Sequence, residues 1–198
     1  MGRRKLYDTS EVLEKAVFSF WRNGYDRTSV RVLEKDMGIN QFSIYASFKN
    51  KSTLYKLVLQ RYSLIIESYF LERLQSADAQ LYDIQAFIES FAFSIKDRII
   101  PEVCLITQTN IRLHAFDSEV EDLVRVHYDK LKSLFTLAVI NSQSSKLIPQ
   151  EMNAEQIAKY LLGLHTSVNA MAKLATKREL RNQIKFAVEA LTNLRYIN

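Results

Sequence analysis

Helix-breaking residues are scarce along this chain, and that scarcity limits the folds it can adopt. Only four glycines and two prolines occur among the 198 residues, whereas turn-rich β-proteins use more of both. Apolar residues instead recur at the three- and four-residue spacing of amphipathic helices over most of the chain. We therefore expect an all-α fold of about nine helices, counted from these periodic segments.

Composition narrows the class of protein further. Apolar residues make up 47% of the chain, enough for a substantial core. A single cysteine, Cys104, cannot form an internal disulfide, which suits a reducing cytoplasm. The first residues, MGRRKLY, lack the apolar segment of a signal peptide, and no apolar run approaches the ~18 residues of a membrane span. The sequence thus predicts a soluble, cytoplasmic protein with no membrane partner.

Positive charge is concentrated in the first third of the chain. Residues 1–62 hold 12 Lys and Arg against 6 Asp and Glu, whereas residues 63–198 hold 15 against 16. Such an asymmetry points to an anionic partner for the basic segment, with nucleic acid first. An ordinary solvated surface is the alternative that charge by itself leaves open.

Two short helical patterns meet at a glycine inside this basic segment. One begins after Thr28–Ser29 and ends at Gly38, which accepts the left-handed conformation of a helix end. The other begins at Asn40, a good capping residue, and turns Ile44 and Phe48 toward the core. Two short helices joined by a tight glycine turn form a helix-turn-helix, whose second helix enters the major groove of DNA.

The side chains around this turn are suited to contact DNA. Gln41 can pair with the edge of adenine, and Phe42 can contact a thymine methyl group. Ser43 and Tyr45 can bind phosphates, as can side chains at the starts of the flanking helices. Burial of Phe42 and Tyr45 in the core is the alternative. The predicted DNA-binding residues are Thr28, Ser29, Arg31, Gln41, Phe42, Ser43, Tyr45, Lys49 and Lys51.

The last two helical patterns have a different signature. Apolar residues over 157–175 and 180–194 alternate steps of four and three, which is the repeat of helices that pack nearly parallel to a partner. Two copies of such a hairpin can form a four-helix bundle across a two-fold axis. The alternative is that these stripes only close the core of the chain itself. The predicted dimer-interface residues are Leu161, Leu164, Val168, Met171, Leu180, Ile184, Ala187 and Leu191.

Periodic segments predict the other helices and a division into domains. Pro101 suits a helix start, because its missing N–H is not needed there. We expect a DNA-binding domain over residues 1–50 and a larger helical domain over residues 51–198 that carries the dimerisation hairpin; a ligand-binding role for this larger domain is implied only by the family resemblance given below. The other predicted helices span 8–24, 51–74, 80–99, 102–115 and 118–142, with a polar loop over 143–153.

No catalytic or metal-binding motif accompanies these helices. The sequence contains no G-x-S-x-G elbow, no phosphate-binding glycine loop and no H-E-x-x-H zinc pair. The histidines His114, His127 and His165 are far apart and share no metal-ligand spacing with Cys104. We therefore expect a protein that is not an enzyme and that needs no cofactor or metal. A helical protein-interaction module, whose basic segment binds acidic proteins, is the alternative.

The basic segment resembles a known family of regulators. The runs FWRNGYDRTSV and MGINQFSIYASFKNKSTLY, within residues 9–62, are similar to the DNA-binding domain of the TetR (tetracycline-repressor) family of bacterial transcriptional regulators. Residues 63–198 are similar to that family in layout only. Two positions depart from the pattern: Glu34 stands where alanine is usual, and Phe42 where a small residue or proline is usual. Phe42 accordingly suggests an operator preference of its own.

That resemblance implies a function for the whole chain. It implies a homodimeric repressor that binds a palindromic operator and is released by a small-molecule effector bound within residues 63–175. Effector binding would move the connecting helix and change the spacing of the two DNA-binding heads. The alternatives are a solid aromatic core and a regulator without a small-molecule ligand. The predicted pocket residues are Tyr69, Phe87, Phe91, Cys104, Gln108, Arg112, Phe135, His165 and Asn169.

Overall fold

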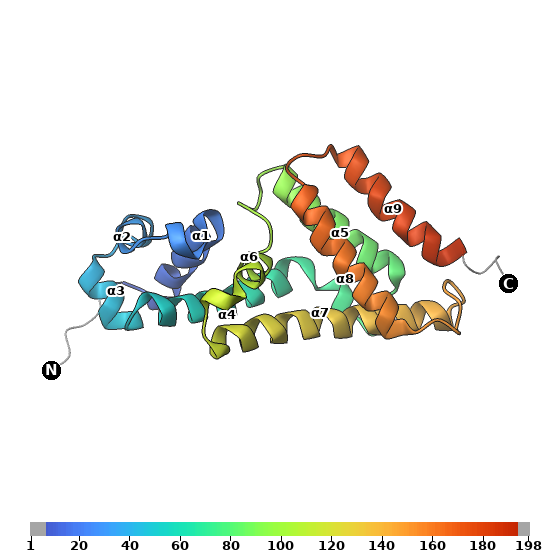
Figure 1. Ribbon diagram of the computed structural model, residues 1–198, viewed down its shortest axis with the longest axis horizontal. Helices are drawn as coiled ribbons and strands as arrows, with labels where there is room; N and C mark the ends of the chain where they lie inside the picture. The colour runs from blue at the N-terminus through green and yellow to red at the C-terminus, as the bar shows by residue number, and fades with distance from the viewer. Residues whose placement is uncertain (1–6, 194–198) are drawn as a thin grey trace. The chain divides into compact units, whose positions relative to one another are not determined.

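The computed structural model describes residues 7–193. Over this range the chain forms nine α-helices, two short 3₁₀ turns and no β-strand (Figure 1), which confirms the predicted all-α class. None of these described helices is long and apolar enough to cross a membrane. The helices are α1 (Thr9–Arg27), α2 (Val30–Met37), α3 (Gln41–Phe48), α4 (Lys51–Phe70), α5 (Leu81–Lys96), α6 (Leu105–Ile111), α7 (Ser118–Ser144), α8 (Ala154–Met171) and α9 (Lys177–Asn193), with the 3₁₀ turns η1 (Arg73–Gln75) and η2 (Leu113–Ala115).

The chain divides into two compact units. The N-terminal unit comprises the described residues up to Ile65 together with Cys104–Arg125, and the C-terminal unit comprises Ile66–Val103 and the described residues from Val126 onward. The predicted boundary after residue 50 does not separate these units. The reason is that most of α4, all of α6 and the start of α7 pack with helices α1 to α3.

Aromatic side chains form the core of the N-terminal unit. The predicted apolar face of α1 is buried, with Phe20 and Trp21 at its centre. The ring of Trp21 meets that of Tyr62 edge-on at a centroid distance of 4.8 Å, and the ring of Phe20 lies 5.0 Å from that of Tyr55. Burial of each large ring contributes about 1.5–3 kcal/mol relative to exposure. This cluster therefore holds α1 on α4.

Gly24 breaks α1 without ending it. The sequence predicts a helix end at this glycine, but helical turns continue to Arg27 while Gly24 itself has φ 73° and ψ 169°. Such a φ is open to glycine and strained for other residues. The break leaves backbone carbonyls without helical donors, and two side chains supply them. The Gln108 amide donates to the Trp21 carbonyl oxygen at 3.2 Å, and the Thr28 hydroxyl donates to the Gly24 carbonyl oxygen at 2.7 Å.

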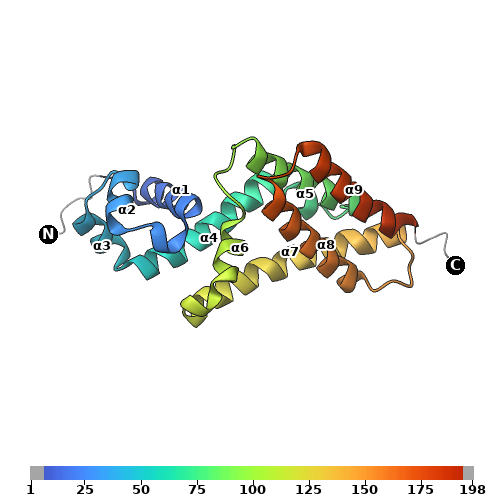
Figure 2. The ribbon, with the colours of Figure 1, turned by 45° about the horizontal axis from the view of Figure 1, so that its top comes forward.

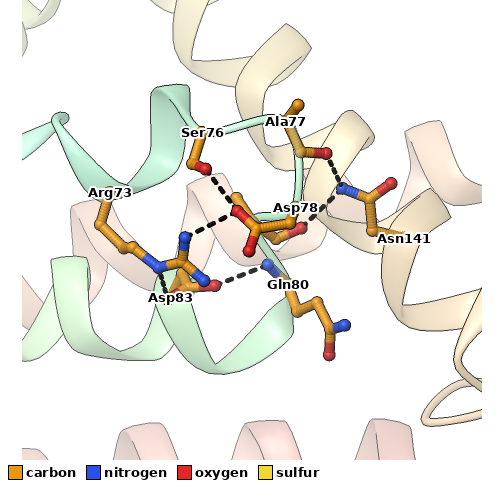
Figure 3. A network of polar contacts seen from close by, with 8 residues as sticks. Arg73, Ser76, Ala77, Asp78, Gln80, Asp83 and Asn141 are labelled. Atoms are coloured by element: carbon orange, nitrogen blue, oxygen red, sulfur yellow. Dashed lines mark hydrogen bonds and ion pairs between the residues drawn. The ribbon is translucent and has the colours of Figure 1, made fainter.

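In the C-terminal unit, α5 lies against α8 and α9, which also contact each other (Figure 2). A polar network holds the turn before α5 (Figure 3). The Arg73 guanidinium binds Asp78 at 2.8 Å and Asp83 at 2.9 Å, and Asp83 also accepts from the Gln80 backbone N–H at 2.7 Å. The Asn141 amide of α7 donates to two carbonyl oxygens of the same turn. The network caps α5 and ties its first turn to α7.

Pro101 does not begin a helix, contrary to the sequence-based prediction. The backbone N–H groups of Ile99 and Ile100 both donate to the Ser94 carbonyl oxygen, at 2.9 and 3.2 Å, after Arg98 turns the chain with φ 59°. These bonds terminate α5, and Pro101 therefore lies in the segment that connects α5 to α6. The predicted helix over 102–115 is correspondingly shorter, running as α6 from residue 105 to 111.

The apolar stripes of α8 and α9 lie inside the chain rather than on its surface. Of the eight residues predicted for a dimer interface, only Met171 is exposed, with 44% of its surface accessible. The packing of α8 and α9 on α5 buries the other seven within one protomer, although two of them, Ala187 and Leu191, also line an open groove between α8 and α9. The residues so buried are Leu161, Leu164, Val168, Leu180, Ile184, Ala187 and Leu191.

Candidate nucleic-acid interface

Side-chain caps define the two helices of the helix-turn-helix. Ser29 accepts the Val32 backbone N–H at 3.3 Å to start α2, and Asn40 accepts the Ser43 N–H at 2.9 Å to start α3. Gly38 joins them with φ 72° and ψ 22°, the left-handed conformation that the sequence indicates. Each helix is eight residues long. The turn therefore has the geometry of a DNA-binding helix-turn-helix.

One face of α3 is buried and the other is open. Ile44 and Phe48 are inside the core, as predicted. Gln41 is exposed, and Phe42 has 84% of its surface accessible, which excludes the alternative that Phe42 is buried. Tyr45 is half-buried. The open face of α3 thus offers an amide, a fully presented aromatic ring and a partly covered phenol.

Thr28 is a correction to the predicted set of DNA-binding residues. Its side chain is buried and its hydroxyl proton is used in the bond to the Gly24 carbonyl oxygen, so it cannot donate to a phosphate. Ser29 and Arg31 are exposed at the first turn of α2. The Ser29 oxygen accepts a helix N–H, which leaves its own proton available for a phosphate oxygen.

Two lysines flank the junction between α3 and α4. Lys49 ends α3 with φ 65°, an unfavourable value for a residue with a side chain, and its N–H donates to the Tyr45 carbonyl oxygen at 2.8 Å. Its side chain is exposed. Lys51 instead places its ammonium 4.2 Å from the centre of the Tyr25 ring, and partial burial lowers the pKa of that ammonium. Lys49 is therefore the more accessible of the two charges.

Two further residues support α3 and were not predicted. The carboxylate of Glu34 accepts the backbone N–H of Gln41, so a second acceptor stands beside Asn40 at the start of α3. The Tyr7 hydroxyl donates to the Ser43 carbonyl oxygen at 3.1 Å and lies 2.8 Å from the Ser47 hydroxyl.

The sequence carries no local signal for either contact. Glu34 belongs to the preceding helix and Tyr7 lies 36 residues before Ser43. By sequence, Glu34 is only a departure from the family pattern, with no evident partner. Its partner is the first N–H of α3, which explains how a carboxylate is accommodated at this position.

The predicted pocket residues separate into three places. Phe87, Phe91, Phe135, His165 and Asn169 come together inside the C-terminal unit. The ring of His165 lies 4.8 Å from that of Phe87 and 5.3 Å from that of Phe91. Burial, with a smaller contribution from His127, lowers the pKa of His165 to about 3, so the imidazole is neutral. The side-chain oxygen of Asn169 is buried and has no hydrogen-bond partner among residues 7–193.

The other predicted pocket residues do not join this cluster. Cys104, Gln108 and Arg112 belong to the N-terminal unit. Arg112 forms an ion pair with Asp26, and both Gln108 and Arg112 line a cavity of about 320 Å³ beside Gly24. Tyr69 is exposed and is not among the rings stacked around His165. Within the described residues, no three His, Cys, Asp or Glu side chains are grouped to hold a metal ion.

An all-helical chain with an N-terminal helix-turn-helix, an exposed α3 face and a separate helical unit defines a class of DNA-binding regulators. The pattern described as "Bacterial regulatory proteins, tetR family" matches residues 12–58. The pattern "Tetracyclin repressor-like, C-terminal domain" matches residues 81–188. The chain therefore belongs to the TetR family, and it is a DNA-binding transcriptional regulator rather than an enzyme.

Individual relatives agree with this assignment over nearly the whole chain. The HTH-type transcriptional repressor ComR of Escherichia coli (strain K12) is 25% identical over 187 residues, covering 92% of this chain and 88% of ComR. A cysteine variant of the TetR family regulator CifR, complexed with 26bp double-strand operator DNA, has the same fold with a TM-score of 0.78 at 20% identity, covering 95% and 99% of the two chains. A TetR family regulator from Agrobacterium tumefaciens has a TM-score of 0.80 at 19% identity, covering 92% and 96%.

Proposed function

We propose that the protein is a repressor that binds a near-palindromic operator as a homodimer and is released by a small-molecule effector. The observation that carries the DNA-binding part is the open face of α3, where Gln41 and Phe42 project from a helix held by two acceptors at its first turn. The name of ComR as a repressor supports repression. The complex of CifR with operator DNA supports binding to a defined site.

The contacts divide into those that specify sequence and those that position the protein. Gln41 can form paired hydrogen bonds with adenine in the major groove. Ser29, Arg31 and Lys49 are exposed around the same helix-turn-helix and would bind phosphates. Tyr45 and Lys51, both half-buried, would add hydrogen bonds from their polar ends, while Ser43 would contribute its hydroxyl.

The decisive experiment selects bound sequences from random DNA and follows the enriched site by gel shift. We expect an inverted repeat and an affinity that falls steeply with salt, with a slope of about −0.9 per neutralised phosphate. Gln41→Ala should relax the preference at one base pair, with a loss of about 1–3 kcal/mol in discrimination. Equal binding to all sequences by the wild-type protein would contradict the proposal.

Dimerisation is proposed through the outward faces of α8 and α9 rather than through their buried stripes. Tyr160, Met171 and Phe186 are large, apolar and exposed on these two helices. Tyr160 also lines an open groove of about 620 Å³ with Ile157 and Leu191, one from each helix. If the same faces of two protomers packed together across a two-fold axis, they would bury the apolar side chains that a single protomer exposes to water.

For the effector, the proposed site is the aromatic cluster around His165 and Asn169. A neutral imidazole and an amide oxygen without a partner are polar groups set among three phenylalanine rings. Effector sites commonly combine an apolar lining with a few polar groups that fix orientation. As a regulator of bacterial genes the protein would act in the cytoplasm.

A further inference from the structure

An apolar hollow lies on the open face of α3. Gln41, Phe42, Tyr45 and Ala46 line it, and Phe42 is 84% exposed. Successive positions are one, three and one residues apart, and Gln41–Tyr45 and Phe42–Ala46 are each four apart, so the four residues share one side of the helix. A phenylalanine held open on an eight-residue helix leaves a large apolar surface in contact with water.

The surroundings of the hollow indicate what covers it. Gln41 forms part of its rim, and the exposed Ser29, Arg31 and Lys49 lie on the same helix-turn-helix or at its end. The hollow is therefore continuous with the surface proposed to bind DNA. Within the major groove, the apolar group that a base pair presents is the C5-methyl of thymine.

We propose that this hollow receives the C5-methyl group of one thymine in each operator half-site, with Phe42 as the residue that specifies that thymine. The ring of Phe42 and the methyl of Ala46 supply the apolar contact, while Gln41 hydrogen-bonds the adenine paired with that thymine, a contact that a cytosine–guanine pair would lose. The proposal rests on the proposed DNA-binding function and adds the chemical group that the hollow selects. 5-Methylcytosine carries the same methyl group, but thymine is the occupant to which the proposal commits.

The test replaces single thymines by deoxyuridine in the selected operator, which removes only the methyl group. Each half-site should contain one thymine whose replacement matters. Replacing it in one half-site should lower the affinity about fourfold, and replacing it in both half-sites should lower the affinity more than tenfold. Placing cytosine at that position should weaken binding further, and 5-methylcytosine should restore only the part of the affinity that the methyl contributes. A return to the full thymine affinity with 5-methylcytosine would overturn the choice of thymine.

Phe42→Ala connects the methyl group to the hollow. The variant should bind the thymine operator more weakly and should lose the distinction between thymine and deoxyuridine. Tyr82→Ala, which removes an exposed aromatic ring from α5, serves as the matched control and should keep the full distinction.

Three results separate failure of the inference from failure of the proposed function. If the protein selects an operator but deoxyuridine is tolerated at every thymine, the inference is overturned while the DNA-binding function stands. The inference is likewise overturned if Phe42→Ala still distinguishes thymine from deoxyuridine. If no operator is selected at all, the proposed function itself fails.

Discussion

Lys49 combines a strained backbone with an exposed charge on the surface proposed to bind DNA. Its φ of 65° and ψ of −61° lie outside the regions that residues with side chains prefer. The chain has a lysine at a position where glycine would fit without strain. We infer that the lysine lowers the stability of the fold at this position and that its benefit is a contact with a DNA phosphate.

Lys49→Gly should therefore change stability and DNA binding in opposite directions. Relief of the backbone should raise the free energy of unfolding by about 1 kcal/mol. Loss of the charge should weaken binding to all sequences and reduce the salt slope by about 1 per half-site. Urea unfolding and gel shifts at several salt concentrations measure the two effects.

Lys146→Gly is the matched control for this change. Lys146 is exposed with φ 61° and belongs to the C-terminal unit, so its replacement should relieve similar strain without affecting DNA binding. A Lys49→Gly variant that binds DNA as tightly as the wild-type protein would remove Lys49 from the interface.

His165 makes the stability of the protein depend on pH. Its pKa is lowered to about 3 by burial in the folded chain, against about 6.5 in an unfolded one. The unfolded chain therefore binds an extra proton below about pH 6.5, and stability decreases as pH falls from there toward 3. The loss attributable to His165 approaches about 1.4 kcal/mol per pH unit once the unfolded histidine is protonated.

His165→Gln should flatten that dependence. Unfolding free energies measured between pH 7 and pH 5 should decline less steeply in the variant, whatever its stability at pH 7. An unchanged slope in His165→Gln would show that the imidazole is not buried and neutral.

At the scale of elements, α3 is a short helix whose position depends on contacts from outside it. Its eight residues are too few to be stable alone. Glu34 of α2 accepts a hydrogen bond from the first N–H of α3. Tyr7, in the segment before α1, bonds to Ser43 and Ser47 of the same helix. The orientation of the open face of α3 therefore depends on residues outside that face.

Tyr7→Phe tests this dependence by removing one hydroxyl and keeping the ring. Without the bonds to Ser43 and Ser47, amide hydrogens of α3 should exchange faster, and stability should fall by about 1 kcal/mol. DNA affinity should decrease severalfold because α3 is less well held. Tyr69→Phe, at an exposed tyrosine, should change neither measurement. Wild-type exchange rates in the Tyr7 variant would contradict the anchoring role.

At the scale of the whole molecule, the proposed repressor requires two copies of the chain. Phe186 is 76% exposed on α9, so replacing it does not disturb the core of the protomer. Phe186→Arg should shift the protein from dimer to monomer in sedimentation and should weaken binding to the full operator more than to a half-site. Tyr82→Arg, on α5, should remain dimeric. A wild-type protein that sediments as a monomer would contradict the dimeric proposal directly.

Several features were predictable because their causes are local. Gly38 permits a left-handed turn, Asn40 caps the next helix, and the spacing of Ile44 and Phe48 marks the buried side of α3. None of these depends on distant residues. The all-helical class, the position of the helix-turn-helix and the basic excess of residues 1–62 follow from the same kind of information.

Other assignments required the tertiary structure. A heptad pattern shows that Leu161 and Leu180 lie on apolar stripes, but not whether the same chain or a second copy covers those stripes. Thr28 is a residue type that often stands at the start of a helix with its hydroxyl accessible. The break at Gly24 instead exposes a backbone carbonyl oxygen to which the Thr28 hydroxyl donates, so this hydroxyl points inward.

By itself, the sequence determined the helical fold and the position of the helix-turn-helix, because periodicity, capping and charge act over a few residues. Only the tertiary structure decided which apolar faces are already covered, which polar groups already have partners, and that Phe42 stands open on α3. Those outcomes depend on contacts between residues far apart in the chain, which spacing along the sequence does not specify.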